Sequence, residues 1–315
     1  MTAIESTAEA ATAAASAEKP ASGEPPHVER PLRGVLLVSL AVLFFACNDI
    51  TTKYLVGHYE VPMVAAVRYI IHLLLMVALL GPSLGRRLVI VHRPVLVLVR
   101  AACLVASTLF MGLGFQLMPV AESVSIVYLA PLVVVLLARP LLGERIGLLG
   151  WLACAAGFCG VLLILRPGGG LDPTGVLYVL GAMVMSVVYY LLSRILARTE
   201  RTSSLLFYVA LCGAIGFGIT LPWTLHGVAP GPLELALFLS LGITAALGHF
   251  LFTAANRDAP ASVLAPIGYT QLIWVGLLSW LFFDHVPDAL TIVGMVIVAG
   301  AGTLIALKST RPARP

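Results

Sequence analysis

Long apolar runs, separated by short segments rich in charge, proline or glycine, occupy the chain from about residue 33 to residue 307. A helix needs about 20 apolar residues to cross a bilayer, and a helix satisfies its own backbone hydrogen bonds in lipid. Each run is therefore predicted to be a transmembrane helix. Cutting at the breaks gives ten spans: 33–54, 62–81, 95–117, 120–138, 146–165, 174–194, 203–225, 232–254, 260–282 and 288–307.

Composition and charge placement support this pattern. The chain is 60% hydrophobic and 11% charged, whereas soluble domains carry about 25% charged residues. If ten spans are present, nearly all of the 19 lysines and arginines fall on the side that holds the N-terminus; the exceptions are Lys53, Arg68 and Arg166. Cytoplasmic segments are enriched in lysine and arginine. This predicts a multi-pass protein of the inner (cytoplasmic) membrane with both termini in the cytoplasm.

The spans divide into two related halves. At an offset of about 140 residues, Gly34-Val35-Leu36 aligns with Gly175-Val176-Leu177, and Glu144 aligns with Asp284. Five spans is an odd number, so the second half must enter the membrane upside down, an arrangement typical of transporters. The predicted fold is an all-α polytopic membrane protein of ten transmembrane helices, built as two inverted five-helix repeats at 33–168 and 172–308. The polar segments 1–32 and 309–315 are predicted to be cytoplasmic tails, the first of them disordered.

Two stretches carry a specific resemblance. Residues 119–169 read PVAESVSIVYLAPLVVVLLARPLLGERIGLLGWLACAAGFCGVLLILRPGG, and residues 259–307 read APASVLAPIGYTQLIWVGLLSWLFFDHVPDALTIVGMVIVAGAGTLIAL. They resemble the ten-helix, EamA-type branch of the drug/metabolite transporter superfamily. The resemblance implies transport of a small metabolite, and within the branch the chain is most similar to uptake-type members, some of which carry S-adenosylmethionine or riboflavin. Phe283-Asp284 departs from the Gly-Glu that members usually have, because it keeps the acid and not the glycine.

Ionisable side chains inside spans are costly, so each is a candidate for function. Asp49 and Arg68 lie at similar distances on either side of the first predicted hairpin, which places them at similar depth. We hypothesise that they pair, or that both face a central cavity and contact a zwitterionic or polar substrate. Lys53 and His72 lie one turn from these residues, on the same helical faces. The alternative is a structural ion pair between the first two helices, with Lys53 extending to the membrane interface.

Further polar and aromatic residues lie in the later spans. Aromatic side chains in the fourth and ninth spans would suit a planar or cationic substrate, or would simply pack. Tyr189 aligns with Asn48 in the repeat, and a lone histidine such as His249 more often makes a helix–helix hydrogen bond than carries a proton. The predicted substrate-binding residues are Asn48, Asp49, Arg68, His72, Tyr128, Tyr189, His249, Tyr269, Gln271 and Trp274.

The sequence contains no pattern typical of catalysis or of a metal site. Its seven histidines form no HxxxH or HExxH pattern, its five cysteines form no CxxC pair, and it has no Walker loop. We therefore predict a secondary transporter of a small polar or aromatic metabolite that works by alternating access, with no cofactor, metal or nucleic-acid partner. An amino-acid or metabolite exporter is the alternative, and a polytopic membrane enzyme or scaffold is the alternative from another class. Substrate, direction, ion coupling and the choice between monomer and homodimer stay open.

Overall fold

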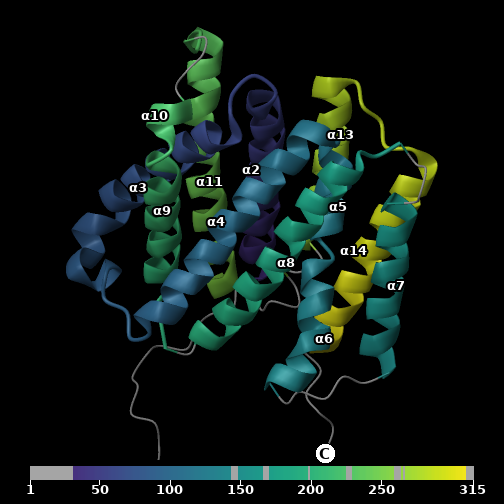
Figure 1. The fold of residues 1–315 in the computed structure, drawn as a ribbon. Helices are drawn as coiled ribbons and strands as arrows, with labels where there is room; N and C mark the ends of the chain where they lie inside the picture. Colours follow the sequence, from purple (N-terminus) through teal and green to yellow (C-terminus); the bar gives the residue numbers. More distant parts are fainter. Residues whose placement is uncertain are drawn as a thin grey trace, which may run out of the picture.

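The chain folds as a bundle of helices. The computed structural model describes residues 31–142, 148–165, 170–197, 199–224, 229–258, 264 and 267–309. The first and last described helices begin and end at the same end of the bundle (Figure 1). The elements are α2 (Pro31–Val56), α3 (Val61–Leu84), η1 (Gly85–Leu88), α4 (Pro94–Leu117), α5 (Val120–Val127), α6 (Ala130–Leu142), α7 (Leu148–Leu165), α8 (Pro173–Leu196), α9 (Thr202–Gly218), α10 (Leu221–Thr224), α11 (Pro232–Asp258), α13 (Gln271–Phe283) and α14 (Ala289–Ser309).

Six segments are long and apolar enough to cross a membrane: Leu32–Val56, Val61–Leu88, Pro94–Leu117, Val120–Leu137, Pro173–Leu196 and Pro232–Ala255. Four shorter apolar helices accompany them: Gly150–Leu165, Thr202–Gly218, Gln271–Phe283 and Ala289–Leu304. Each of these segments overlaps one predicted span, which makes the chain a multi-pass membrane protein. The predicted tails lie outside the described residues, except that Pro31, Leu32 and Ser309 are helical.

Two spans are interrupted at equivalent places. A turn at Tyr128 and Leu129 separates α5 from α6, and a turn at Tyr269 and Thr270 precedes α13. Pro131 explains the first break, because a proline cannot donate a backbone hydrogen bond to the preceding turn. Tyr128 and Tyr269 are therefore counterparts, with a difference of 141 in residue number.

This difference corrects the sequence alignment of the two halves. At 141 residues, Gly143-Glu144 aligns with Asp284-His285, so the pairing of Glu144 with Asp284 is wrong by one residue. Asp284 has a φ of 51°, in the left-handed region that glycine adopts readily and aspartate tolerates. Asp284 thus takes the place of the expected glycine, and His285 takes the place of the expected acid.

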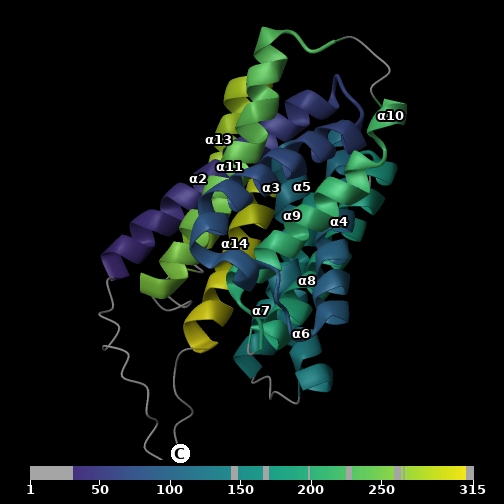
Figure 2. The ribbon, with the colours of Figure 1, turned by 90° about the vertical axis from the view of Figure 1, so that its left-hand side faces the viewer.

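The helices pack in pairs that exchange between the halves. α2 packs along α11, and α4 packs along α8; the first of these pairs is also visible in Figure 2. In both pairs the first helix of one half lies against the third helix of the other half. α3 with α9 and α7 with α14 pair the second helices and the last helices with each other. Two repeats related by a two-fold axis would produce this set of contacts.

The α7–α14 pair shows how closely the backbones approach. A Cβ added at Gly160 of α7 would lie 2.8 Å from the carbonyl oxygen of Gly294 on α14. Membrane helices use small residues at such contacts, because lipid tails provide little drive for larger apolar side chains to leave the lipid. These glycines therefore serve packing.

Candidate functional site

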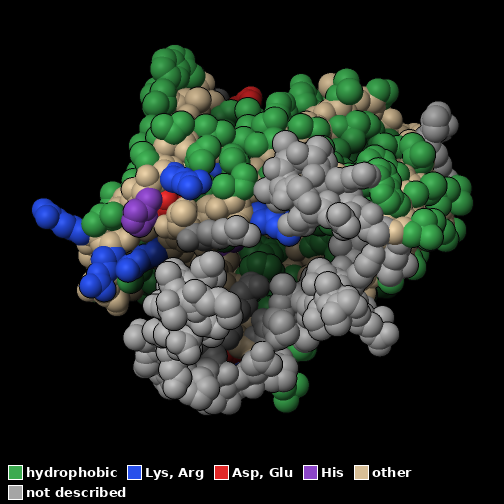
Figure 3. All heavy atoms as spheres, turned by 90° about the horizontal axis from the view of Figure 1, so that it is seen from below, with side chains coloured by type: hydrophobic (Ala, Val, Ile, Leu, Met, Phe, Trp, Pro, Cys, Tyr) green, Lys and Arg blue, Asp and Glu red, His purple; other side chains and the backbone are tan. Residues whose placement is uncertain are grey.

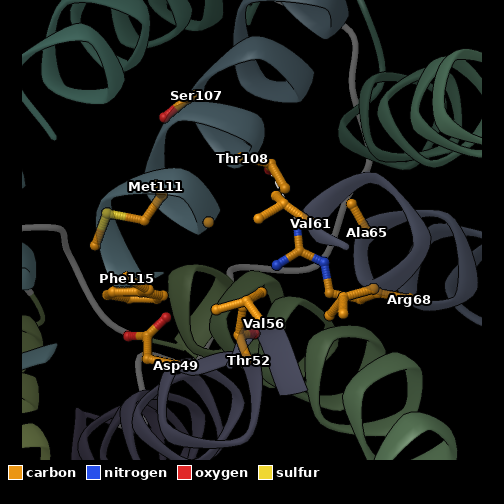
Figure 4. Close-up of a pocket in the computed structure, with 12 residues that line it drawn as sticks. Asp49, Thr52, Val56, Val61, Ala65, Arg68, Ser107, Thr108, Met111 and Phe115 are labelled. Atoms are coloured by element: carbon orange, nitrogen blue, oxygen red, sulfur yellow. Dashed lines mark hydrogen bonds between the residues drawn. The ribbon is translucent and has the colours of Figure 1, made fainter. Parts of the chain in front are cut away.

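A pocket of about 140 Å³ lies between α2, α3 and α4. Its ionisable side chains are Asp49 from α2 and Arg68 from α3, which enter from different sides with their charged ends directed inward (Figure 4). The rest of the wall is neutral and mostly apolar: Thr52, Val56, Val61, Val64, Ala65, Ser107, Thr108, Met111, Gly112 and Phe115. The structure therefore brings Asp49 and Arg68 to one cavity, the second of the two arrangements hypothesised for them.

Arg68 does not contact Asp49 directly. Its Nη2 donates a hydrogen bond to Thr108 Oγ1 at 2.9 Å, and its Nη1 donates a longer one to Asn48 Oδ1 at 3.4 Å. Among the described residues, the ion pairs within 4.0 Å lie elsewhere, at Arg33–Asp258, His92–Glu200 and His285–Glu122. The hypothesised direct pair is therefore absent among the described residues, and the guanidinium faces the pocket with neutral hydrogen-bond partners.

Asn48 and Asp49 point to different neighbours, because successive residues of a helix are about 100° apart. Asn48 Nδ2 donates to the Leu241 carbonyl at 2.9 Å and to Thr244 Oγ1 at 3.0 Å, both on α11. Asp49 Oδ2 accepts a hydrogen bond of 2.9 Å from Gln271 Nε2, at the start of α13. The polar pair thus joins the first helix to two helices of the other half.

Gln271 connects Asp49 to the two helix interruptions. The Tyr128 hydroxyl lies 2.9 Å from Gln271 Oε1 and 3.1 Å from the Gly268 carbonyl oxygen. The rings of Tyr128 and Tyr269 are 5.1 Å apart. Both broken spans therefore meet beside Asp49. Discontinuous helices in matching positions of two repeats commonly mark the substrate site of secondary transporters.

The remaining candidates lie outside the pocket lining. His72 and His249 stack between α3 and α11, with ring centroids 5.7 Å apart and planes 12° apart. Phe45 contacts His249 edge-on at 5.1 Å. Trp274 is partly buried and packs against apolar side chains of the core. The structure therefore gives His72, His249 and Trp274 packing contacts.

Tyr189 belongs to a separate cluster around Arg100. Arg100 is buried, and it donates hydrogen bonds to Tyr189 OH at 2.9 Å, Ser193 Oγ at 2.7 Å and the Leu205 carbonyl at 3.1 Å. Tyr189 follows Asn48 by 141 residues, and Leu241 follows Arg100 by the same number. The Tyr189–Arg100 contact is therefore the counterpart of the Asn48–Leu241 contact. Sequence reasoning placed Arg100 with the cytoplasmic charges and missed this burial.

Two further contacts were missed at the end of the bundle away from the chain ends. Lys53 Nζ donates to the carbonyl oxygens of Phe115 and Met118, the latter at 3.1 Å, so the structure gives this ammonium backbone partners at the end of α4. Glu122 Oε1 contacts His285 Nε2 at 2.9 Å, and Glu122 Oε2 is buried with no hydrogen-bond partner among the described residues. Glu122 lies in the first turn of α5, where the helix dipole favours an anion.

Comparison with known proteins identifies the family. The EamA-like transporter family matches residues 32–166 and 173–307, two segments that again differ by 141. A riboflavin transporter of Rhizobium johnstonii is 28% identical over 290 residues, which cover 90% of this chain and 94% of the relative. An S-adenosylmethionine uptake transporter of Rickettsia prowazekii is 24% identical over 275 residues, covering 87% and 92%. A pseudopaline exporter of Pseudomonas aeruginosa is 28% identical over 196 residues, covering 61% and 67%.

A solved crystal structure supports the fold. It superposes with a TM-score of 0.62 at 21% identity and covers 88% of this chain and 99% of the other. The matched family and the named relatives are transporters and not enzymes, so the alternative of a membrane enzyme is wrong. The chain belongs to the EamA-like transporter family, within the drug/metabolite transporter superfamily.

Proposed function

We propose that this protein is a secondary transporter with ten transmembrane helices in two inverted repeats, residues 33–168 and 172–308. The exchange of helix partners between the halves supports the two-fold relation. Basic side chains gather on the face seen from below (Figure 3), at the end where α2 begins and α14 ends (Figure 1). Arg86 and Arg87 on η1 and Arg93 before α4 are exposed. Both termini then lie in the cytoplasm, because cytoplasmic loops carry the excess of basic residues.

The observation that carries the proposal is the pocket with Asp49 and Arg68 facing it from different helices. A charge inside the membrane costs a few kcal/mol or more unless it is paired or solvated. These two groups hold neutral partners instead of each other, so a carboxylate and a guanidinium both remain for a ligand. A zwitterionic group satisfies both at once, with its ammonium on Asp49 and its carboxylate on Arg68.

The pocket volume constrains how much of the substrate it holds. Pockets for drug-sized ligands are about 300–1,000 Å³, whereas this one is about 140 Å³. It suits a group of amino-acid size. We propose that the Tyr128 and Tyr269 rings, which lie next to Gln271 and outside the pocket lining, contact the remainder of the molecule. S-adenosylmethionine, named for one relative, combines an amino-acid group with a planar base, and we propose a metabolite of that kind as the substrate.

Export is the second candidate, because a pseudopaline exporter is among the relatives. The same zwitterion-binding pocket serves either direction in an alternating-access cycle. Flux into and out of vesicles loaded on one side distinguishes uptake from export. Repeating the measurement with and without a pH gradient shows whether a proton moves with the substrate.

The test is uptake of candidate metabolites into proteoliposomes, with Asp49→Asn and Arg68→Gln as test variants. Each removes one charge while keeping a polar side chain, and asparagine also keeps the size of aspartate. Arg33→Gln is the matched control, because Arg33 pairs with Asp258 at the end holding the termini and its side chain is 60% exposed. The proposal expects saturable flux that both test variants abolish at normal membrane levels and that the control preserves. Loss of the protein itself in both test variants would instead make Asp49 and Arg68 structural.

A further inference from the structure

The outer ends of α2 and α4, meaning the ends away from the chain termini, are joined by two reciprocal contacts. Lys53, in the last turn of α2, donates to the carbonyl oxygens of Phe115 and Met118 at the end of α4. Gln116, in the last turn of α4, donates from Nε2 to the carbonyl oxygen of Val56, the final residue of α2, at 2.9 Å. Each helix therefore supplies a side chain that caps the end of the other.

These contacts provide hydrogen-bond donors for carbonyl groups at the helix ends. The last four carbonyl groups of a helix have no partner within the helix, and they carry the negative end of the helix dipole. An ammonium is well matched to such carbonyls. Inside a membrane the match matters more, because lipid offers no replacement hydrogen bond. Separating the two helix ends removes both caps unless water enters.

The reciprocal caps lie directly over the pocket. Val56 and Phe115 contribute carbonyl oxygens to the caps and also line the pocket. Asp49 is one helical turn from Lys53 along α2. The capped ends of α2 and α4 therefore lie on a route from Asp49 toward the outer side.

We infer that Lys53 and Gln116 latch an outer gate between α2 and α4, which closes the pocket to the side opposite the termini. The inference rests on the proposed transport function. Lys53 and Gln116 are positioning residues in this reading, since they contact backbone carbonyls and not the pocket. Breaking either cap shifts the population toward the state in which the outer end is open.

Labelling of a pocket cysteine measures gate opening without any substrate. The reporter is Thr52→Cys, a pocket-lining position on α2, in a chain whose five native cysteines are replaced by alanine. A membrane-impermeant maleimide is added to the face opposite the termini of vesicles with known orientation. Lys53→Met and Gln116→Leu each remove one cap, and Gln116→Leu changes no charge near the thiol. Arg33→Met is the control, because it removes a basic α2 contact at the opposite end.

The gate predicts that Lys53→Met and Gln116→Leu raise the labelling rate about five-fold or more, the factor that corresponds to one hydrogen bond. Arg33→Met should leave the rate unchanged. An unchanged labelling rate in monodisperse Lys53→Met and Gln116→Leu proteins would contradict the gate. The two caps would then be static structural contacts between α2 and α4. If Lys53→Met does not accumulate in the membrane, the labelling rate of Gln116→Leu alone tests the gate: a raised rate supports it and an unchanged rate rejects it. If labelling rises but no metabolite shows flux, the gate is supported and the proposed transport function is rejected. Failure of the gate and failure of the transport function are therefore distinguishable.

Discussion

Gly302 on α14 provides a sharp test of how the site is supported from behind. A Cβ added at Gly302 would overlap the ring of Tyr269, so Gly302→Ala must displace that ring from Tyr128, 5.1 Å away. Overpacking costs about 1–3 kcal/mol, and loss of the ring pair costs about 0.5–1.5 kcal/mol. The higher helix propensity of alanine offsets about 1 kcal/mol. We expect a net destabilisation of about 1–3 kcal/mol, together with reduced flux because Tyr128 holds Gln271 against Asp49.

Thermal unfolding in detergent and uptake in proteoliposomes measure these two effects. Gly300→Ala is the matched control, because it lies on the same helix and a Cβ there meets nothing within 4 Å. In a Tyr269→Ala background the cost of Gly302→Ala should disappear, which a double-mutant cycle detects as coupling between the two positions. The reasoning is refuted if Gly302→Ala is as harmless as Gly300→Ala in the wild-type background.

Two further substitutions test buried charge. Arg100→Gln should lower the unfolding free energy by roughly 3 kcal/mol, because it removes charge-assisted bonds to three partners; the exposed Arg93→Gln at the same end should change the midpoint of thermal unfolding little. Glu122→Gln should leave stability unchanged or raise it, because it removes a buried charge with one unpartnered oxygen while its amide oxygen can still accept from His285. A clear loss of thermal stability in Glu122→Gln would contradict this.

The apolar pattern was enough to locate six long apolar helices and four shorter ones, because crossing lipid demands a run of about 20 apolar residues wherever it occurs. The similar depth of Asp49 and Arg68 could also be predicted, since they flank one short hairpin, and both line the same pocket. The hydrogen-bond partners of these residues could not be predicted in the same way. Asp49 bonds to Gln271, which is 222 residues away in the chain, and only the packing of the two halves brings them together.

Lys53 shows a second limit of sequence reasoning. A lysine near the end of a span is usually expected to reach the interface, and this expectation uses only the helix that carries the residue. Its actual partners are the last carbonyls of α4, which no side-chain pattern reveals. The burial of Arg100 was not predicted for the same reason, because it depends on contacts with α8 and α9. The pairing of Glu144 with Asp284 was off by one residue, because the interrupted helices differ by 141 residues, as the other aligned pairs do.

The position of Trp274 has a spectroscopic consequence. The chain holds four tryptophans, and Trp151, Trp223 and Trp280 are 47%, 71% and 54% exposed on the outer surface of the bundle. Trp274 is instead partly buried, within one turn of Gln271 on the same helix. Replacing the three outward indoles by phenylalanine would leave Trp274 as the single tryptophan, one helical turn from the Gln271 that donates to Asp49. Emission from that one indole would then report occupancy of the site in an unlabelled protein, even for a substrate that is not yet known.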